Sequence, residues 1–147
     1  MNDIHTRNKA TVAVLREAQY NFEPENVRAQ ICSLFNKEAL IQLGHPFETI
    51  ENPDALYTEV YHGLNQAIPD LERRDTIVMA GSTPNGDNWV GCCGYYTGSF
   101  ERPWLDIPPT GHQVAMRFHE FFRIEEDQII EMQALWDIPE VMMQARA

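Results

Sequence analysis

The residues with the clearest potential for acid/base chemistry lie in the last third of the chain. Asp137 follows an apolar run and precedes a proline at position 139, and Glu120 interrupts a series of alternating apolar residues. A carboxylate among apolar side chains is costly unless it is partnered, solvated or used. Burial would raise the pKa of such a carboxyl group and make it a competent base. We therefore predict that Asp137 is the base of a proton-transfer step; the alternative is that it caps the closing helix.

Such a step also needs a hydrogen-bond donor near the oxygen that becomes negatively charged. Tyr96, His45 and Gln133 are the candidates, since a phenol, an imidazole and an amide can each donate. Each has an ordinary alternative. Tyr96 can be a core residue with a satisfied hydroxyl, and His45 a solvated loop residue. Gln133, like Glu120, can be exposed or held by an arginine.

The segment from Val114 to Trp136 positions most of these residues. Apolar and polar side chains alternate from Val114 to Ile124, which is the period of a β-strand. The polar residues 125–128 predict a hairpin turn, and a second strand follows over residues 129–136. If Ile124 faces Ile129 across the turn, then Phe118 lies opposite Leu135, Glu120 opposite Gln133 and Arg117 opposite Trp136.

This register gives the hairpin two semi-apolar faces, one of which carries the carboxylates. The residues predicted to line a substrate pocket are Met116, Phe118, Glu120, Phe122, Leu135 and, from the preceding proline-rich loop, Trp104. The opposite face carries Arg117, His119 and Trp136, and we expect it to form the interface of a homodimer. A register shift of one residue would exchange these sets.

Helices are predicted ahead of this hairpin. Helical spacing of apolar residues covers 6–20 and 25–35, and a third helix begins at Pro53 with Asn52 as its N-cap and runs towards Ala67. Strands are predicted over 39–43, 72–80 and 89–100, and a short helix closes the chain. The order α-α-β-α-β-β-β-β predicts one α+β domain over residues 1–147, with helices packed on one face of a curved antiparallel sheet.

Composition limits the classes of function. A net charge of -11 argues against binding to nucleic acid or to an anionic membrane surface. We find neither a signal-like start nor a membrane-spanning run, so we expect a cytoplasmic protein. The cysteines lack CxxC spacing, the histidines lack HxH or HExxH spacing, and no glycine-rich phosphate loop precedes a helix. We therefore expect chemistry without a metal or cofactor.

Several short motifs occur in a characteristic order. They are Ala67-Ile68-Pro69-Asp70-Leu71, Gly94-Tyr95-Tyr96-Thr97-Gly98, Pro109-Thr110-Gly111, the hairpin from Arg123 to Glu131, Asp137 and Gln144. With them the chain resembles the SnoaL-like polyketide cyclases, within the nuclear transport factor 2 and ketosteroid isomerase superfamily, over roughly Thr11 to Gln144. Tyr96 stands where that family often has a histidine, and Gln128 where its hairpin has a glycine.

The resemblance implies a cone-shaped fold, in which a bent sheet wraps a long helix and encloses an apolar pocket. It also implies ring closure by aldol condensation without a cofactor, an aspartate at position 137 as the acid/base group, and a dimer through the sheet. We therefore expect a cofactor-free enzyme that cyclises or isomerises a hydrophobic cyclic or polyketide-like carbonyl compound. The alternative is a non-catalytic module of the same fold that binds a small molecule or another protein.

An epoxide hydrolase-like member of this superfamily would need an Asp-Arg-Asp arrangement in its pocket. The hairpin offers only Arg117 with Asp137 for such a set, and the predicted register places these two on opposite faces.

Overall fold

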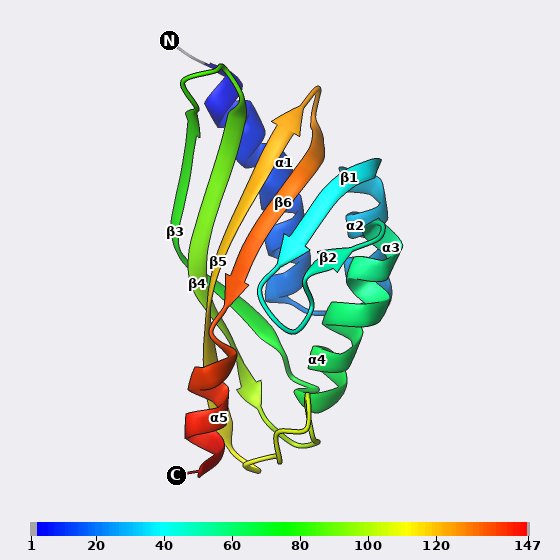
Figure 1. The fold of residues 1–147 in the computed structure, drawn as a ribbon, viewed down its shortest axis with the longest axis vertical. Coiled ribbons are helices and arrows are strands. Elements are labelled where there is room, and N and C mark those ends of the chain that lie inside the picture. Colours follow the sequence, from blue (N-terminus) through cyan, green and yellow to red (C-terminus); the bar gives the residue numbers. More distant parts are fainter. Residues whose placement is uncertain (1–2, 147) are drawn as a thin grey trace.

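The computed structural model describes residues 3–146. Helices α1 (Asp3–Tyr20) and α2 (Pro24–Leu34) lead into strand β1 (Phe35–Leu43) (Figure 1). After the short strand β2 (Thr49–Ile50), one continuous helical stretch comprises α3 (Pro53–Ala55), the π-helical segment η1 (Leu56–Tyr61) and α4 (His62–Ala67). The remaining elements are β3 (Glu72–Ser82), β4 (Asn88–Ser99), β5 (Gln113–Glu125), β6 (Gln128–Trp136) and α5 (Ile138–Arg146).

Within residues 3–146 the six strands form one open, curved sheet in the order β2-β1-β6-β5-β4-β3. The α+β class and the predicted order of the elements are confirmed, and the short strand β2 is an additional element that was not predicted. The sheet is mixed rather than wholly antiparallel, because β1 pairs parallel with β6. Figure 1 shows α1 running behind the sheet and the stretch from α3 to α4 standing beside it, so that the core lies between these helices and the sheet.

Local sequence explains where the helices begin. The Glu23 carboxylate accepts hydrogen bonds from the backbone N–H groups of residues 25 and 26, and Pro24 occupies the first turn. The predicted N-cap Asn52 is confirmed, since its Oδ1 accepts from the Ala55 N–H at 2.8 Å. Within η1 the side chains of Tyr57 and Tyr61 are both buried, so this π-helical segment adds two tyrosines to the apolar side chains of the core.

The predicted register of the hairpin is correct at the turn and wrong beyond it. Ile124 pairs with Ile129, but the register then shifts, so that Arg123 pairs with Glu131. Ile130 is therefore the extra residue of a β-bulge, and past it each β6 side chain lies on the face opposite to the one predicted. Phe118 faces Trp136 rather than Leu135.

The bulge does not affect β5, whose inward and outward side chains are as predicted. On β6, the side chains beyond the bulge that were predicted to point inward point outward, and the reverse. The inward β5 residues Val114, Met116, Phe118, Glu120, Phe122 and Ile124 are all buried. Beyond the bulge, Met132, Ala134 and Trp136 are the buried residues of β6, whereas Leu135 is 66% exposed. The predicted inward position of Leu135 and the predicted outward position of Trp136 are therefore both wrong.

A second bulge interrupts β3 where it pairs with β4. Asp75 pairs with Gly94 and Ile77 with Cys93, so Thr76 is the extra residue. Before the bulge Arg73 and Asp75 face the core, and after it Ile77 is exposed on the outer face. Gly94 permits this close approach, because a Cβ atom there would lie only 1.9 Å from the backbone oxygen of residue 74.

Candidate active site

A buried ion pair lies at the centre of the molecule. Arg73 on β3 places its Nη1 atom 2.7 Å from Oε1 of Glu120 on β5, and the side chains of both residues have 0% exposure. Desolvating two charges is expensive, so a buried pair persists only where further hydrogen bonds satisfy both groups. The surrounding residues supply such bonds.

Two tyrosines and a tryptophan surround the Glu120 carboxylate. The Tyr96 hydroxyl donates to Oε2 of Glu120 at 2.6 Å, and Trp136 Nε1 donates to the same atom at 2.9 Å. The hydroxyl oxygens of Tyr61 and Tyr96 lie 2.8 Å apart. Because the Tyr96 hydroxyl donates its only proton to Glu120, the Tyr61 hydroxyl must be the donor in its hydrogen bond with Tyr96. The result is a directed chain of hydrogen bonds from Tyr61 through Tyr96 to Glu120.

The guanidinium of Arg73 is held from its other sides by α1 and by its own strand. Gln19 on α1 accepts from Arg73 Nη1 at 2.7 Å. Asp75 accepts from Arg73 Nε at 3.2 Å through both oxygens. A second cation, Arg16 on α1, donates through its Nε to Asp75 at 2.9 Å. We refer to Arg16, Gln19, Tyr61, Arg73, Asp75, Tyr96, Glu120 and Trp136 as the central cluster.

The formal charges of the central cluster balance, with two guanidinium groups and two carboxylates. Burial disfavours the charged form of Arg73, but Glu120, Tyr96 and Asp75 outweigh this effect and hold the pKa of Arg73 well above its ordinary value. Burial, reinforced by the Glu120 charge, raises the pKa of Tyr96. The phenol therefore stays protonated and acts as a hydrogen-bond donor.

Two donors of the central cluster have no hydrogen-bond partner among the residues that the structure describes. They are Nη2 of Arg73 and Nε2 of Gln19. Both atoms are buried, and a buried donor without an acceptor costs about 1–3 kcal/mol. Native structures satisfy the great majority of such groups, so each of these two donors is able to take a further acceptor atom.

Aromatic rings cover the central cluster from the interior of the cone. The ring of Trp136 lies 5.1 Å from that of Tyr96 and 5.4 Å from that of Tyr61. Phe47 lies 5.7 Å from Trp136 and 6.4 Å from Trp104, measured between ring centroids. These rings connect the cluster to the loops at residues 44–48 and 100–112, and they surround it with flat apolar surface.

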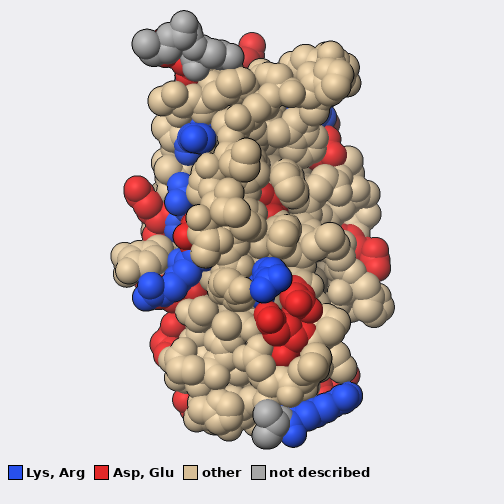
Figure 2. Space-filling model, turned by 90° about the vertical axis from the view of Figure 1, so that its left-hand side faces the viewer, with Lys and Arg blue, Asp and Glu red and all other residues tan. Residues whose placement is uncertain are grey.

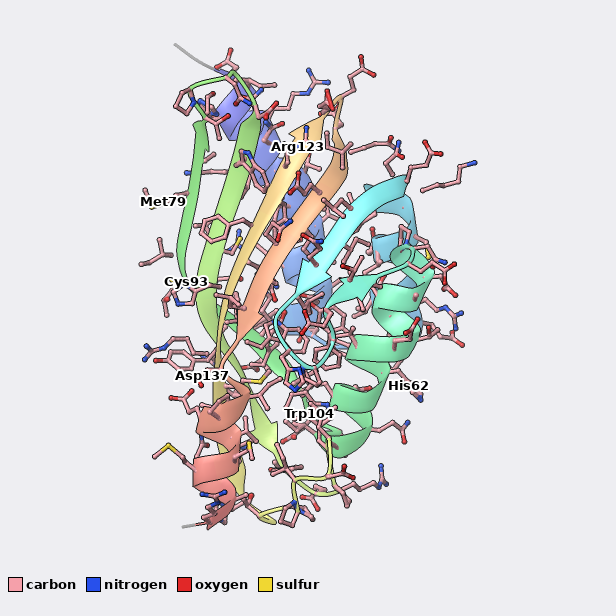
Figure 3. All side chains as sticks on the ribbon, in the orientation of Figure 1. His62, Met79, Cys93, Trp104, Arg123 and Asp137 are labelled. Atoms are coloured by element: carbon pink, nitrogen blue, oxygen red, sulfur yellow. The ribbon has the colours of Figure 1, made fainter. Side chains whose placement is uncertain are left out.

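The residues predicted as base and donors lie in different parts of the molecule. Asp137 is exposed at the start of α5, where its Oδ1 accepts from the Glu140 N–H at 3.1 Å, so the burial predicted for it is wrong and it caps the helix (Figure 3). The His45 side chain is 88% exposed and lies 3.6 Å from Glu48. Gln133 is on the outer face of the sheet. Tyr96 alone of the four belongs to the central cluster.

The residues predicted to line a pocket divide in the same way. Glu120 belongs to the central cluster, and Met116, Phe118, Phe122 and Trp104 are buried in the apolar core. Phe118 also lies beneath the guanidinium of Arg73, with 4.3 Å from Cζ to the ring centroid. Leu135 is on the outer face because of the bulge at Ile130.

The sequence analysis missed Arg16, Gln19, Tyr61, Arg73 and Asp75 as site residues, and it placed Trp136 on the outer face. For the β3 residues a signal was present: Leu71, Arg73 and Asp75 alternate in one strand, so an apolar residue and two charged residues share a face. The sequence offers no comparable signal for Gln19, because its partner Arg73 lies far along the chain on another element.

The cysteines and acidic residues give no indication of a metal centre. Among residues 3–146 no group of three or more histidine, cysteine, aspartate or glutamate side chains is arranged to hold an ion. Cys92 and Cys93 point to opposite faces of β4, as predicted, and burial raises the pKa of the Cys92 thiol to about 12. No helix within this range is long and apolar enough to cross a bilayer.

Comparison with known proteins gives consistent results. Residues 49–145 match the model of the family described as SnoaL-like polyketide cyclase. A candidate SnoaL-like polyketide cyclase from Jannaschia sp. CCS1 superposes with a TM-score of 0.81 at 23% identity, over 100% of this chain and 96% of that one. No curated protein matches the sequence.

Two Streptomyces structures are also similar in fold. A candidate hydroxylase from Streptomyces galilaeus has a TM-score of 0.78 at 14% identity, covering 97% of this chain and 86% of that one. A candidate polyketide cyclase from Streptomyces antibioticus has a TM-score of 0.74 at 18% identity, covering 95% and 99%. At these levels of sequence identity, structural similarity establishes the fold but not the reaction.

We predict that the two members of the central ion pair are strongly coupled in stability. Glu120→Leu should cost about 3–5 kcal/mol of unfolding free energy, because it leaves Arg73 buried with one charged partner fewer. The double variant Arg73→Met with Glu120→Leu should be more stable than Glu120→Leu alone. Urea denaturation monitored by circular dichroism measures both.

The exposed pair of Arg7 and Asp127 provides the control, since it is solvated on the surface. Arg7→Met with Asp127→Leu should change stability little and show no strong coupling. A double variant no more stable than Glu120→Leu alone would contradict the predicted coupling.

Proposed function

Because the chain belongs to the SnoaL-like polyketide cyclase family, we propose that it is a cofactor-free acid/base enzyme. It acts on a small hydrophobic carbonyl compound, which it cyclises or isomerises. The main support for this proposal is the hydrogen-bonded chain from Tyr61 through Tyr96 to Glu120. A carboxylate joined to two hydroxyl groups in a water-excluded interior provides both a proton acceptor and a route for the proton's return.

Glu120 is the proposed base in place of Asp137. A carboxylate has about four lone-pair positions, and three donors occupy three of those on Glu120, namely Arg73, Tyr96 and Trp136. The fourth lone-pair position is left to accept a proton from a carbon atom of the substrate. In an aldol step the resulting enolate attacks a second carbonyl carbon, and the alkoxide so formed takes up the proton through Tyr96. The proton that Glu120 removes is thus returned, and the enzyme ends in its starting state.

The proposed substrate is a flat, cyclic or polyketide-like molecule. The rings of Phe47, Tyr61, Phe118 and Trp136 lie around the central cluster and favour stacking of planar apolar surface. Exclusion of water by these rings strengthens every electrostatic contact that the substrate makes inside.

Hydration of an epoxide is a second candidate function. The arrangement it needs, an arginine between two carboxylates, is provided by Asp75, Arg73 and Glu120 rather than by the predicted Arg117 and Asp137. Asp75 is 10% exposed and borders a surface hollow between α1 and β3. It takes a proton from the water molecule that attacks the epoxide carbon, while the opened oxygen receives a proton from the tyrosine chain. The proton held by Asp75 then restores the tyrosine chain, so the diol leaves with no net change in the enzyme.

The proposed partner is a second copy of this chain, bound through the outer face of the sheet. Ile77, Met79, Phe121 and Leu135 are all exposed on that face. Figure 2, which views this side, shows few charged side chains over its upper half. The proposed interface retains Arg117 and His119 and lacks Trp136, which the bulge turns inward. Exposed apolar side chains of this number favour burial against another protein surface.

We predict that Glu120→Gln greatly slows proton exchange at carbon. A panel of polycyclic ketones in D₂O should take up deuterium next to the carbonyl in the presence of the wild-type protein. Glu120→Gln should slow this uptake by at least about a hundredfold, and Tyr96→Phe should slow it less. Mass spectrometry of the recovered ketones measures both rates.

Asp137→Asn separates the two candidate bases, because asparagine keeps the N-cap and removes the carboxylate. Uptake should be unchanged in this variant. Loss of uptake in Asp137→Asn, with Glu120→Gln active, would return the role of base to Asp137. A wild-type protein that binds ketones without exchange would favour the non-catalytic module.

For the epoxide reaction, hydrolysis of cyclic epoxides in H₂¹⁸O should place one labelled oxygen in the diol. Asp75→Asn should stop this incorporation and should slow deuterium uptake by ketones much less than Glu120→Gln does, since Glu120 is unaltered. Mass spectrometry of the diol gives the result, and absence of diol with the folded wild-type protein would exclude this candidate.

For the dimer, sedimentation equilibrium of the wild-type protein should give twice the mass of the chain. Phe121→Glu or Leu135→Glu should yield monomers, because each buries a charge at the proposed interface. Met143→Glu is the matched control, since Met143 is an exposed apolar residue on α5, away from that face. A monomeric wild-type protein would refute the proposed interface.

A further inference from the structure

We propose that Gln19 and Arg73 together bind the substrate oxygen that becomes negatively charged. The substrate is then a carbonyl compound that forms an enolate, and its oxygen lies between Nε2 of Gln19 and Nη2 of Arg73. This inference rests on the proposed function and assigns the group that stabilises its charged intermediate.

The orientation of the Gln19 amide is determined by its neighbour. The Gln19 oxygen must face Arg73, because it accepts from Nη1 at 2.7 Å and the guanidinium has no acceptor to offer the amide nitrogen. The nitrogen Nε2 therefore faces the Tyr61 hydroxyl, on which it acts as a donor, but it makes no hydrogen bond of normal geometry with any acceptor among residues 3–146. The amide is thus an oriented donor held by the residue with which it would share the oxygen.

The orientation of the second donor, Nη2 of Arg73, is also fixed by hydrogen bonds to neighbouring residues. Arg73 Nε is engaged by Asp75, and Nη1 is engaged by Gln19, Tyr96 and Glu120. The planar guanidinium is therefore fixed from two sides, and Nη2 has no partner of its own. Preorganised donors of this kind stabilise developing charge most effectively, since they need no rearrangement during the reaction.

Charge balance favours an enolate at this position. When Glu120 removes a proton from carbon, the C–H bonding electrons move into the new carbon–carbon double bond and the carbonyl oxygen acquires the negative charge. Glu120 becomes neutral in the same step. Arg16 and Arg73 still face two negative groups, now Asp75 and the enolate oxygen. The net charge of the buried cluster is unchanged, so the step avoids the cost of adding a charge to the interior.

Gln19 comes from the N-terminal helix α1, ahead of the segment that matches the family. The family match covers residues 49–145, so Arg73 and Glu120 lie inside it and Gln19 lies outside. Helix α1 therefore contributes a group that touches the reacting oxygen, in addition to covering the sheet. A surface hollow lined by Arg16, Tyr20, Asn21, Arg73 and Asp75 lies beside the end of this helix.

Ionised 4-nitrophenol serves as a probe, because its oxygen resembles an enolate and its yellow colour reports the anion. In the resting protein the charged Glu120 opposes a second anion. Glu120→Gln makes that position neutral, as proton uptake does, and should raise the affinity for 4-nitrophenolate about tenfold or more. Adding Gln19→Leu to Glu120→Gln should reverse this gain, since a hydrogen bond to a charged group is lost. Absorbance titration at a pH where the free probe is ionised measures each affinity.

Matched variants keep the test decisive. Gln19→Met preserves side-chain volume if the leucine variant does not fold, and Gln19→Glu keeps the oxygen that faces Arg73 while replacing the donor with a second anion. Both should weaken binding in the Glu120→Gln background. Gln66→Leu, at an exposed glutamine on α4, should have no effect.

Two outcomes would overturn the assignment: no gain in affinity with Glu120→Gln, or a gain that persists without the Gln19 amide. These are distinguishable from failure of the proposed function. Deuterium uptake that depends on Glu120, together with weak phenolate binding, would refute only the oxygen site. Tight phenolate binding without any deuterium uptake would refute only the proposed catalysis.

Discussion

The buried pair of Arg73 and Glu120 is the interaction on which the interior depends. Two charges without access to water are tolerated only if their remaining hydrogen-bonding positions are filled. The fold meets this requirement by drawing a partner from several elements: Gln19 from α1, Tyr61 from the π-helical segment, Tyr96 from β4 and Trp136 from β6. The polar centre therefore fixes how these elements face one another, in a core that is otherwise apolar.

The two β-bulges determine which side chains reach that centre. Without the extra residue Ile130, Trp136 would face outward and Glu120 would lose a donor. The bulge at Thr76 lies directly after Asp75, so the strand can offer two charged residues to the interior and then expose Ile77. Local irregularities of this kind commonly re-aim side chains beside functional sites.

Much of the architecture could be read from the sequence, because it depends on short-range patterns. The alternation from Val114 to Ile124 identified the buried face of β5, and Asn52 with Pro53 marked the start of a helix. A bulge has no comparable signature, since one added residue leaves the composition of the strand unaltered. Asp137 was for this reason assigned to the wrong environment. Gln19 could not be found, because its role arises only when α1 packs beside β3.

The burial of the central cluster has a kinetic consequence. Tyr61, Tyr96 and Glu120 have essentially no surface that a water molecule can touch, so the described conformation is closed. A ligand that reaches them must bind to a rarer, open conformation in which rings such as Phe47 and Trp104 have moved apart. The measured affinity is then the intrinsic affinity reduced by the fraction of molecules that are open. Substitutions that loosen the loops around these rings would thus alter binding without touching the ligand.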